Sequence, residues 1–150
     1  MDRLERVLQL FYDKYNCAQS VFAACAGDEG LPEAERLALA SAFGGGVAGQ
    51  GEICGALTGA LLALGEARRK EIEADPVAAR KAVYEQARQI TSAFRAVHGS
   101  ILCRELTGCA LDTEEGHRAF QERDVRKTVC SKLVVFAVKQ VSEATDTPQA

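Results

Sequence analysis

The residues best suited to chemistry in this 150-residue chain are its six cysteines, because a thiolate is both a nucleophile and a ligand for soft metals. No two of them form a CxxC pair, which excludes the zinc-ribbon, thioredoxin and contiguous bacterial ferredoxin patterns. A site with four thiols must therefore be assembled by the fold from separate segments. The cysteines are Cys17, Cys25, Cys54, Cys103, Cys109 and Cys130.

Three of these cysteines fall at predicted helix starts. Cys17 directly follows the capping residue Asn16, Cys54 follows a glycine-rich stretch, and Cys103 lies in the first turn of a short helix. The N-terminus of a helix carries a partial positive charge that lowers the pKa of a thiol and favours the thiolate. Cys130 instead falls inside the last predicted helix, where burial as an apolar residue explains it equally well.

Glycines surround Cys54 in the stretch FGGGVAGQGEICGALTGALLALG, residues 43–65. A ridge of small residues recurs every four positions, and each glycine in a helix interior costs about 1 kcal/mol relative to alanine, so some gain must offset it. Two explanations stay open: another helix packs closely on the ridge, or backbone N–H groups cradle an anionic group beside Cys54. The ridge is Gly51, Gly55, Gly59, Ala63 and Ala67, and the glycines predicted to contact a cofactor are Gly45, Gly46, Gly51, Gly55 and Gly59.

Composition and charge exclude several classes of protein. With 47% hydrophobic residues, the chain is long enough for one domain over residues 1–150. Its 18 basic and 21 acidic residues are dispersed, so we expect no nucleic-acid partner. The absence of a signal peptide or a long apolar run predicts a cytoplasmic protein without membrane insertion. No catalytic triad, Walker loop or GxGxxG motif assigns an enzyme class.

The pattern of apolar residues predicts an all-α fold, a compact multi-helix bundle with a glycine-rich loop before the central helix. Apolar residues recur at helical spacing, and period-two alternation is scarce. His98 ends one helix, where we expect the dipole to stabilise its imidazolium. The predicted helices lie around 4–11, from 17 onward, at 32–43, from about 52 to about 74, at 76–97, at 101–108, after Asp112 or Thr113, and at 124–144, followed by a frayed tail at 145–150.

Four motifs together resemble the redox-active protein family C_GCAxxG_C_C. They are NCAQSV, the glycine stretch above, GSILCRELTG and VCSKLV, and the resemblance spans about residues 15–135. It maps the family's four cysteines onto Cys17, Cys54, Cys103 and Cys130 and implies a small helical protein from a prokaryote, assigned to redox or metal chemistry. Similar helical modules accompany haem domains in split-Soret cytochromes, where an iron-sulfur site has been suggested. This chain lacks CxxCH and has only two histidines, so we predict no haem.

The leading hypothesis is that these four cysteines converge on one site that binds an iron-sulfur cluster, for electron transfer or redox sensing with an unidentified redox partner protein. Following the resemblance, a [2Fe–2S] cluster is preferred over zinc.

Two alternatives stay open. In the first, the thiols work without metal, with a pair such as Cys17 and Cys54 cycling between dithiol and disulfide. In the second, the protein is a helical interaction module with buried cysteines. The apolar face of the last helix would also suit a homodimer, and Cys25 or, more plausibly, Cys109 could replace a family cysteine at the site.

Overall fold

The computed structural model describes residues 1–146, and within them the chain is helical with no strand, which confirms the all-α prediction. Only an isolated bridge pairs Ile53 with Leu102. The helices are α1 (Arg3–Asp13), α2 (Cys17–Ala24), α3 (Glu33–Leu39), α4 (Gly55–Ala67), α5 (Arg69–Ala74), α6 (Pro76–His98), α7 (Cys103–Thr107), α8 (Glu114–Glu122) and α9 (Ser131–Asp146), with the short turn η1 (Ser41–Phe43) and the wide π-helical turn η2 (Arg126–Cys130).

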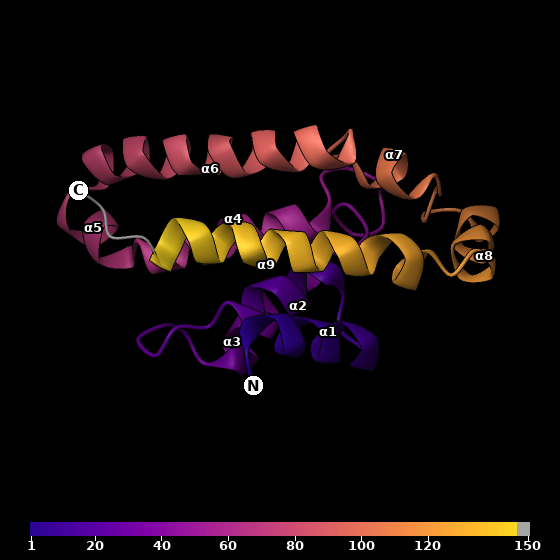
Figure 1. The fold of residues 1–150 in the computed structure, drawn as a ribbon, viewed down its shortest axis with the longest axis horizontal. Coiled ribbons are helices and arrows are strands. Elements are labelled where there is room, and N and C mark those ends of the chain that lie inside the picture. Colours follow the sequence, from indigo (N-terminus) through magenta and orange to yellow (C-terminus); the bar gives the residue numbers. More distant parts are fainter. Residues whose placement is uncertain (147–150) are drawn as a thin grey trace.

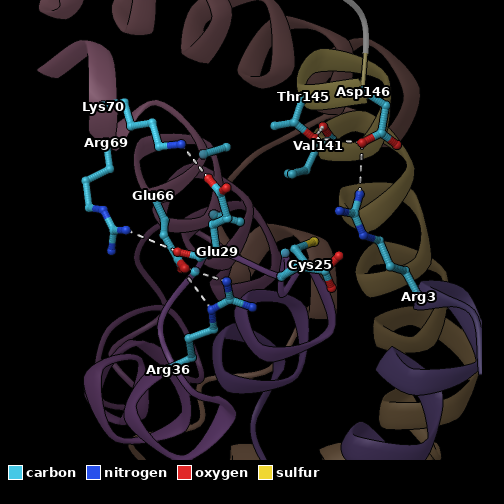
Figure 2. A pocket seen from close by; sticks show the side chains of 15 residues that line it. Arg3, Cys25, Glu29, Arg36, Glu66, Arg69, Lys70, Val141, Thr145 and Asp146 are labelled. Atoms are coloured by element: carbon cyan, nitrogen blue, oxygen red, sulfur yellow. Dashed lines mark hydrogen bonds and ion pairs between the residues drawn. The ribbon is translucent and has the colours of Figure 1, made fainter.

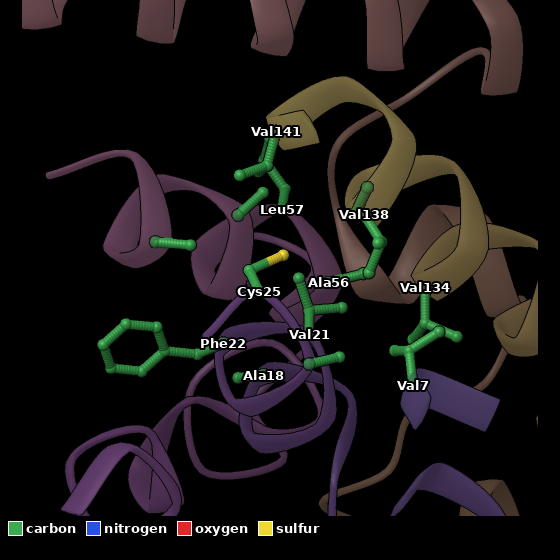
Figure 3. Close-up of a cluster of buried hydrophobic side chains, with 14 of the residues drawn as sticks. Val7, Ala18, Val21, Phe22, Cys25, Ala56, Leu57, Val134, Val138 and Val141 are labelled. Carbon is green, nitrogen blue, oxygen red and sulfur yellow. The ribbon is translucent and has the colours of Figure 1, made fainter. Parts of the chain in front are cut away.

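The hydrophobic core lies where α4 packs against both α2 and α9 (Figure 1). α1 covers α2 and α9 on one side, and the long helix α6 runs along α4 and α9 on the other. Within residues 1–146, no helix combines the length and apolarity needed to cross a lipid bilayer. Figure 3 shows part of the core, whose buried members include Val7, Val21, Phe22, Leu57, Leu64, Phe94, Val134, Val138 and Val141.

The small residues of α4 allow α2 to approach it closely. A Cβ atom at Gly59 would lie 2.7 Å from the carbonyl oxygen of Ala18 and 3.0 Å from Val21 Cβ. The helix-packing explanation therefore accounts for this part of the ridge. The ridge is shorter than predicted, because Gly51 precedes α4 with a φ of 77° and Ala67 is exposed.

The prediction of one helix from about residue 52 to about residue 74 is wrong in two respects: the helix starts later, and it is interrupted in the middle. α4 begins at Gly55 because residues 52–54 are extended and hydrogen-bond to the segment before α7. A break at Arg68 separates α4 from α5. The Arg68 guanidinium is buried there and donates to Gln86 Oε1 at 3.1 Å and to the Ala144 carbonyl oxygen at 2.9 Å.

Two further predicted helices start with different residues. The helix expected at 32–43 is divided into α3 and η1, and Pro32 is its N-cap. The helix expected at 101–108 begins at Cys103 after the N-cap Leu102, because the Ser100 hydroxyl accepts the backbone N–H of Leu102 at 3.0 Å.

The predictions near the C-terminus are correct in part. Of the two caps considered for α8, Thr113 is the one that accepts, from Gly116 N at 3.0 Å. The final helix starts with the wide turn η2 and continues to Asp146. Thr145 and Asp146 are therefore helical rather than frayed, and the remaining tail residues 147–150 lie outside the described residues.

His98 is part of an aromatic cluster instead of a charged helix cap. Its ring centroid lies 4.8 Å from those of both Phe94 and Phe136. Burial lowers the pKa of His98, and within the described residues Nε2 has no hydrogen-bond partner. The predicted imidazolium is wrong, because desolvation of the charged ring opposes the helix dipole.

We expect His98→Phe to weaken the pH dependence of stability. Because the folded-state pKa is below the unfolded value of about 6.5, the folded protein loses stability as the pH falls through this region. A phenylalanine retains the ring packing and carries no titrating group. Urea unfolding of both proteins at pH 5 and pH 7.5 measures the difference, and an equal pH dependence in the variant would contradict this role.

Candidate functional site

Four of the six cysteines line one pocket with a volume of about 330 Å³. They come from four separate segments: Cys17 starts α2, Cys54 is the N-cap of α4, Cys103 starts α7 and Cys130 ends η2. Cys54 and Cys103 are buried, whereas the other two are half-buried. The structure brings together the four predicted site cysteines, and their chemical role stays a prediction.

Cys17 is fixed by the cap of α2. The Asn16 side chain accepts from Gln19 N at 2.9 Å, and the Gln19 side chain accepts from Asn16 N at 3.0 Å. This reciprocal capping box sets the direction in which α2 begins. Cys17 consequently occupies a defined place at the helix N-terminus.

A short antiparallel pairing brings Cys54 and Cys103 to the same pocket. Cys54 N donates to the Ile101 carbonyl oxygen at 2.8 Å, and Cys103 N donates to the Glu52 carbonyl oxygen at 2.7 Å. α4 and α7 then start from the two paired segments. The sequence analysis missed this pairing, since neither segment shows the alternation of a strand.

The glycine loop before Cys54 turns in the left-handed sense. Residues 45–49 all have positive φ, from 52° to 75°, although Val47 and Ala48 are not glycines. Left-handed backbone costs an L-residue about 1–2 kcal/mol, so other contacts must hold the loop. Among them, Gly51 N donates to the Gly45 carbonyl oxygen at 3.0 Å, and Glu52 N donates to that of Gly46 at 2.8 Å.

Of the glycines predicted to contact a cofactor, Gly45 lines the pocket, and its backbone N–H lowers the pKa of Cys17. Gly46 and Gly55 lie behind cysteines of the pocket wall, and Gly51 and Gly59 lie away from the pocket. A Cβ at Gly46 would lie 2.7 Å from Cys103 Cβ, and one at Gly55 would overlap Cys17 Sγ. Gly51 and Gly59 instead face residues that do not line the pocket.

The remaining cysteines do not line this pocket. Cys109 is hydrogen-bonded to Thr107: its backbone N donates to Thr107 Oγ1 at 3.2 Å, and its Sγ donates to the Thr107 carbonyl oxygen at 3.4 Å. Cys25 lines a second, larger cavity of about 460 Å³ between α4, α9 and the loop after α2 (Figure 2). Both cysteines therefore lie outside the lining of the four-cysteine pocket.

The family model described as "Putative redox-active protein (C_GCAxxG_C_C)" matches residues 15–144. This chain belongs to the C_GCAxxG_C_C family. The match extends over all four pocket cysteines and confirms the resemblance found in the motifs. No curated protein and no solved structure matches the chain significantly.

The pocket cysteines of this C_GCAxxG_C_C protein are protonated thiols in the absence of a compensating charge. Burial raises the pKa of Cys103 to about 11 and that of Cys130 to about 12, and it also raises the pKa values of Cys17 and Cys54. The backbone N–H of Gly45 lowers the pKa of Cys17, but by less than burial raises it. The expected lowering of the pKa at helix starts is wrong, because desolvation is the larger effect.

The donor set of the family cysteines suits an iron-sulfur cluster, since four thiols are its usual protein ligands. The geometry is less suited to a single ion. Within residues 1–146, no group of three or more His, Cys, Asp or Glu side chains is arranged to hold one metal ion. All six cysteines are free thiols. A single tetrahedral zinc would require the sulfurs to move closer together.

Arg126 is a pocket residue that the sequence analysis missed. Its Nη2 donates to the carbonyl oxygen of Tyr15 at 2.9 Å and to that of Phe11, and its guanidinium carbon lies 4.1 Å from the Phe11 ring centroid. The positive charge lowers the pKa values of Cys17 and Cys130 against the effect of burial. The sequence could have indicated this residue, because Arg126 lies four positions before Cys130 and residues at that spacing share one face of a helix.

Proposed function

We propose that this C_GCAxxG_C_C protein carries out redox chemistry at the four-cysteine pocket, with Cys17, Cys54, Cys103 and Cys130 as the ligands of an iron-sulfur cluster. The main support is that thiols from four separate segments line one cavity and that the residues lining it include no carboxylate. Four sulfur donors without competing carboxylates in the described lining favour iron-sulfur chemistry over binding of hard cations.

The protonation of the thiols supports a metal-bound state over free thiol chemistry. A buried thiol with a raised pKa is a weak nucleophile, because the thiolate is the reactive form. Metal binding deprotonates the thiols and supplies the positive charge that the pocket otherwise provides only through Arg126. A bound cluster would supply one-electron transfer to a partner protein. The Gly45 N–H would stabilise the negative charge of the Cys17 sulfur in that state.

A metal-free dithiol is the second candidate, favoured by the finding that no group of three ligands is assembled for a metal ion within residues 1–146. In that case two pocket thiols would form a disulfide while reducing a disulfide of a partner protein to two thiols. Two electrons and two protons would pass to the partner. This exchange would require one pocket thiol to be deprotonated first.

Metal analysis of protein purified without oxygen tests the proposal. We expect iron and acid-labile sulfide in stoichiometric amounts and visible absorption, all lost in Cys54→Ser. The matched control is Cys25→Ala, which removes a buried thiol outside the pocket and should retain the cluster. Circular dichroism verifies that both variants are folded.

Other results of the same analysis would decide against the cluster. Protein without iron and sulfide would contradict it, and zinc alone would identify a different metal. Thiol titration of metal-free protein before and after mild oxidation would then measure whether two pocket thiols disappear together, as the dithiol alternative requires.

A further inference from the structure

The four-cysteine pocket has an unbalanced charge. Arg126 is the only Arg, Lys, Asp or Glu among its lining residues within 1–146. The second cavity differs, because its four basic residues are balanced by four acidic ones (Figure 2). There Lys70 pairs with Glu29 at 2.6 Å, Arg36 pairs with Glu66, and Arg3 lies 3.5 Å from Asp146.

Arg126 retains unused hydrogen-bond donors. Only its Nη2 donates to the protein, to two backbone carbonyl oxygens, and no carboxylate in residues 1–146 pairs with it. Its Nε and Nη1 groups donate no hydrogen bond to the described residues. The unused donors of this half-buried guanidinium suit the two oxygens of a carboxylate.

The rest of the pocket wall is mostly apolar. Beyond the cysteines and the glycine loop, its side chains include Phe11, Leu106, Leu111, Phe120 and Leu133. The polar side chains of Asn16, Ser41, Thr107 and His117 also line the cavity. A cavity of about 330 Å³ with one arginine in a mostly apolar wall has the character of a small-molecule site. A guanidinium favours an anionic ligand, and an apolar wall favours a short hydrocarbon group attached to that anion.

We propose that the four-cysteine pocket binds a small organic monocarboxylate with a short apolar chain, and that Arg126 is the residue that binds its carboxylate. The proposal rests on the proposed function, because the bound molecule would lie against the same cysteines that carry out the redox chemistry. Arg126 would hold the carboxylate while the apolar wall covers the chain and excludes water.

Titration calorimetry with butyrate and butyramide tests this on the protein as purified. The two probes have nearly the same shape and differ in charge. We expect butyrate to bind at least tenfold more tightly than butyramide, and acetate to bind more weakly than butyrate. Arg126→Gln should weaken butyrate binding about tenfold, and Arg126→Lys, which keeps the charge but loses the planar pair of donors, should weaken it less.

The matched control is Arg69→Gln, which removes a cation of the second cavity and should leave butyrate binding unchanged. Equal binding of butyrate and butyramide, no binding of either, or full butyrate affinity in folded Arg126→Gln would overturn the proposal. Iron and sulfide content measured on the same samples distinguishes its failure from failure of the cluster proposal. Butyrate binding in metal-free protein would contradict the cluster alone, and a cluster with no butyrate binding would mean that Arg126 balances the cluster instead.

Discussion

Gly59→Ala is expected to lower the free energy of unfolding by about 1–3 kcal/mol, although alanine is the better helix former. The added Cβ would lie 2.7 Å from the Ala18 carbonyl oxygen and 3.0 Å from Val21 Cβ, so α2 and α4 would have to separate. Both neighbours belong to the packed core, which leaves little room for them to shift. Urea unfolding followed by circular dichroism measures the change.

Gly65→Ala is the matched control on the same helix. Nothing lies within 4 Å of a Cβ at Gly65, so only the helix propensity changes. We expect a gain of about 0.5–1 kcal/mol there. Opposite signs at the two positions would attribute the Gly59 effect to interhelical contact, whereas stabilisation at both would show that α2 and α4 are not closely packed.

The close packing of α2 on α4 also affects the four-cysteine pocket. Gly55 lies one turn before Gly59 on α4, and a Cβ there would overlap Cys17 Sγ and lie 2.9 Å from the Phe43 carbonyl oxygen. The two explanations offered for the small-residue ridge are therefore connected. Close packing of α2 on α4 is also what places the Cys17 thiol beside the start of α4.

The helical character of the chain and the caps formed by residues close in the sequence could be predicted, because both depend on neighbours along the chain. The capping box of Asn16 and Gln19 is an example, since its two hydrogen bonds join residues three positions apart. The break at Arg68 could not be predicted in this way. It depends on Gln86 and on the carbonyl oxygen of Ala144, which are distant in the sequence.

The cysteines of the site could be identified from motifs, but their surroundings could not. The pairing of residues 52–54 with the segment before α7 involves too few residues to produce a sequence pattern. The raised thiol pKa values follow from burial, which the position of a cysteine at a helix start does not indicate. Arg126 lies in the pocket because its guanidinium donates to the carbonyl oxygens of Phe11 and Tyr15, which are far from it in the sequence.

Glu66→Gln is expected to be the most destabilising of the substitutions considered, by about 3–5 kcal/mol. Arg36 is 2% exposed, and the Glu66 side chain accepts from its Nε at 2.8 Å, from its Nη2 and from Leu31 N at 2.6 Å. Glutamine retains the shape but removes the negative charge. The buried guanidinium, whose Nη1 already has no partner within the described residues, would then have no balancing anion.

Two comparison variants separate the effect of burial from that of pairing itself. Lys70→Ala breaks an ion pair in the same cavity whose side chains are 74% and 77% exposed, so we expect no clear change in stability. Arg36→Met combined with Glu66→Leu removes both buried charges and should recover much of the loss, because neither ion is left unpaired. Urea unfolding of the four proteins measures these differences. If the double variant is no more stable than Glu66→Gln, removing both charges does not recover the loss, and the unpaired buried charge is not its cause.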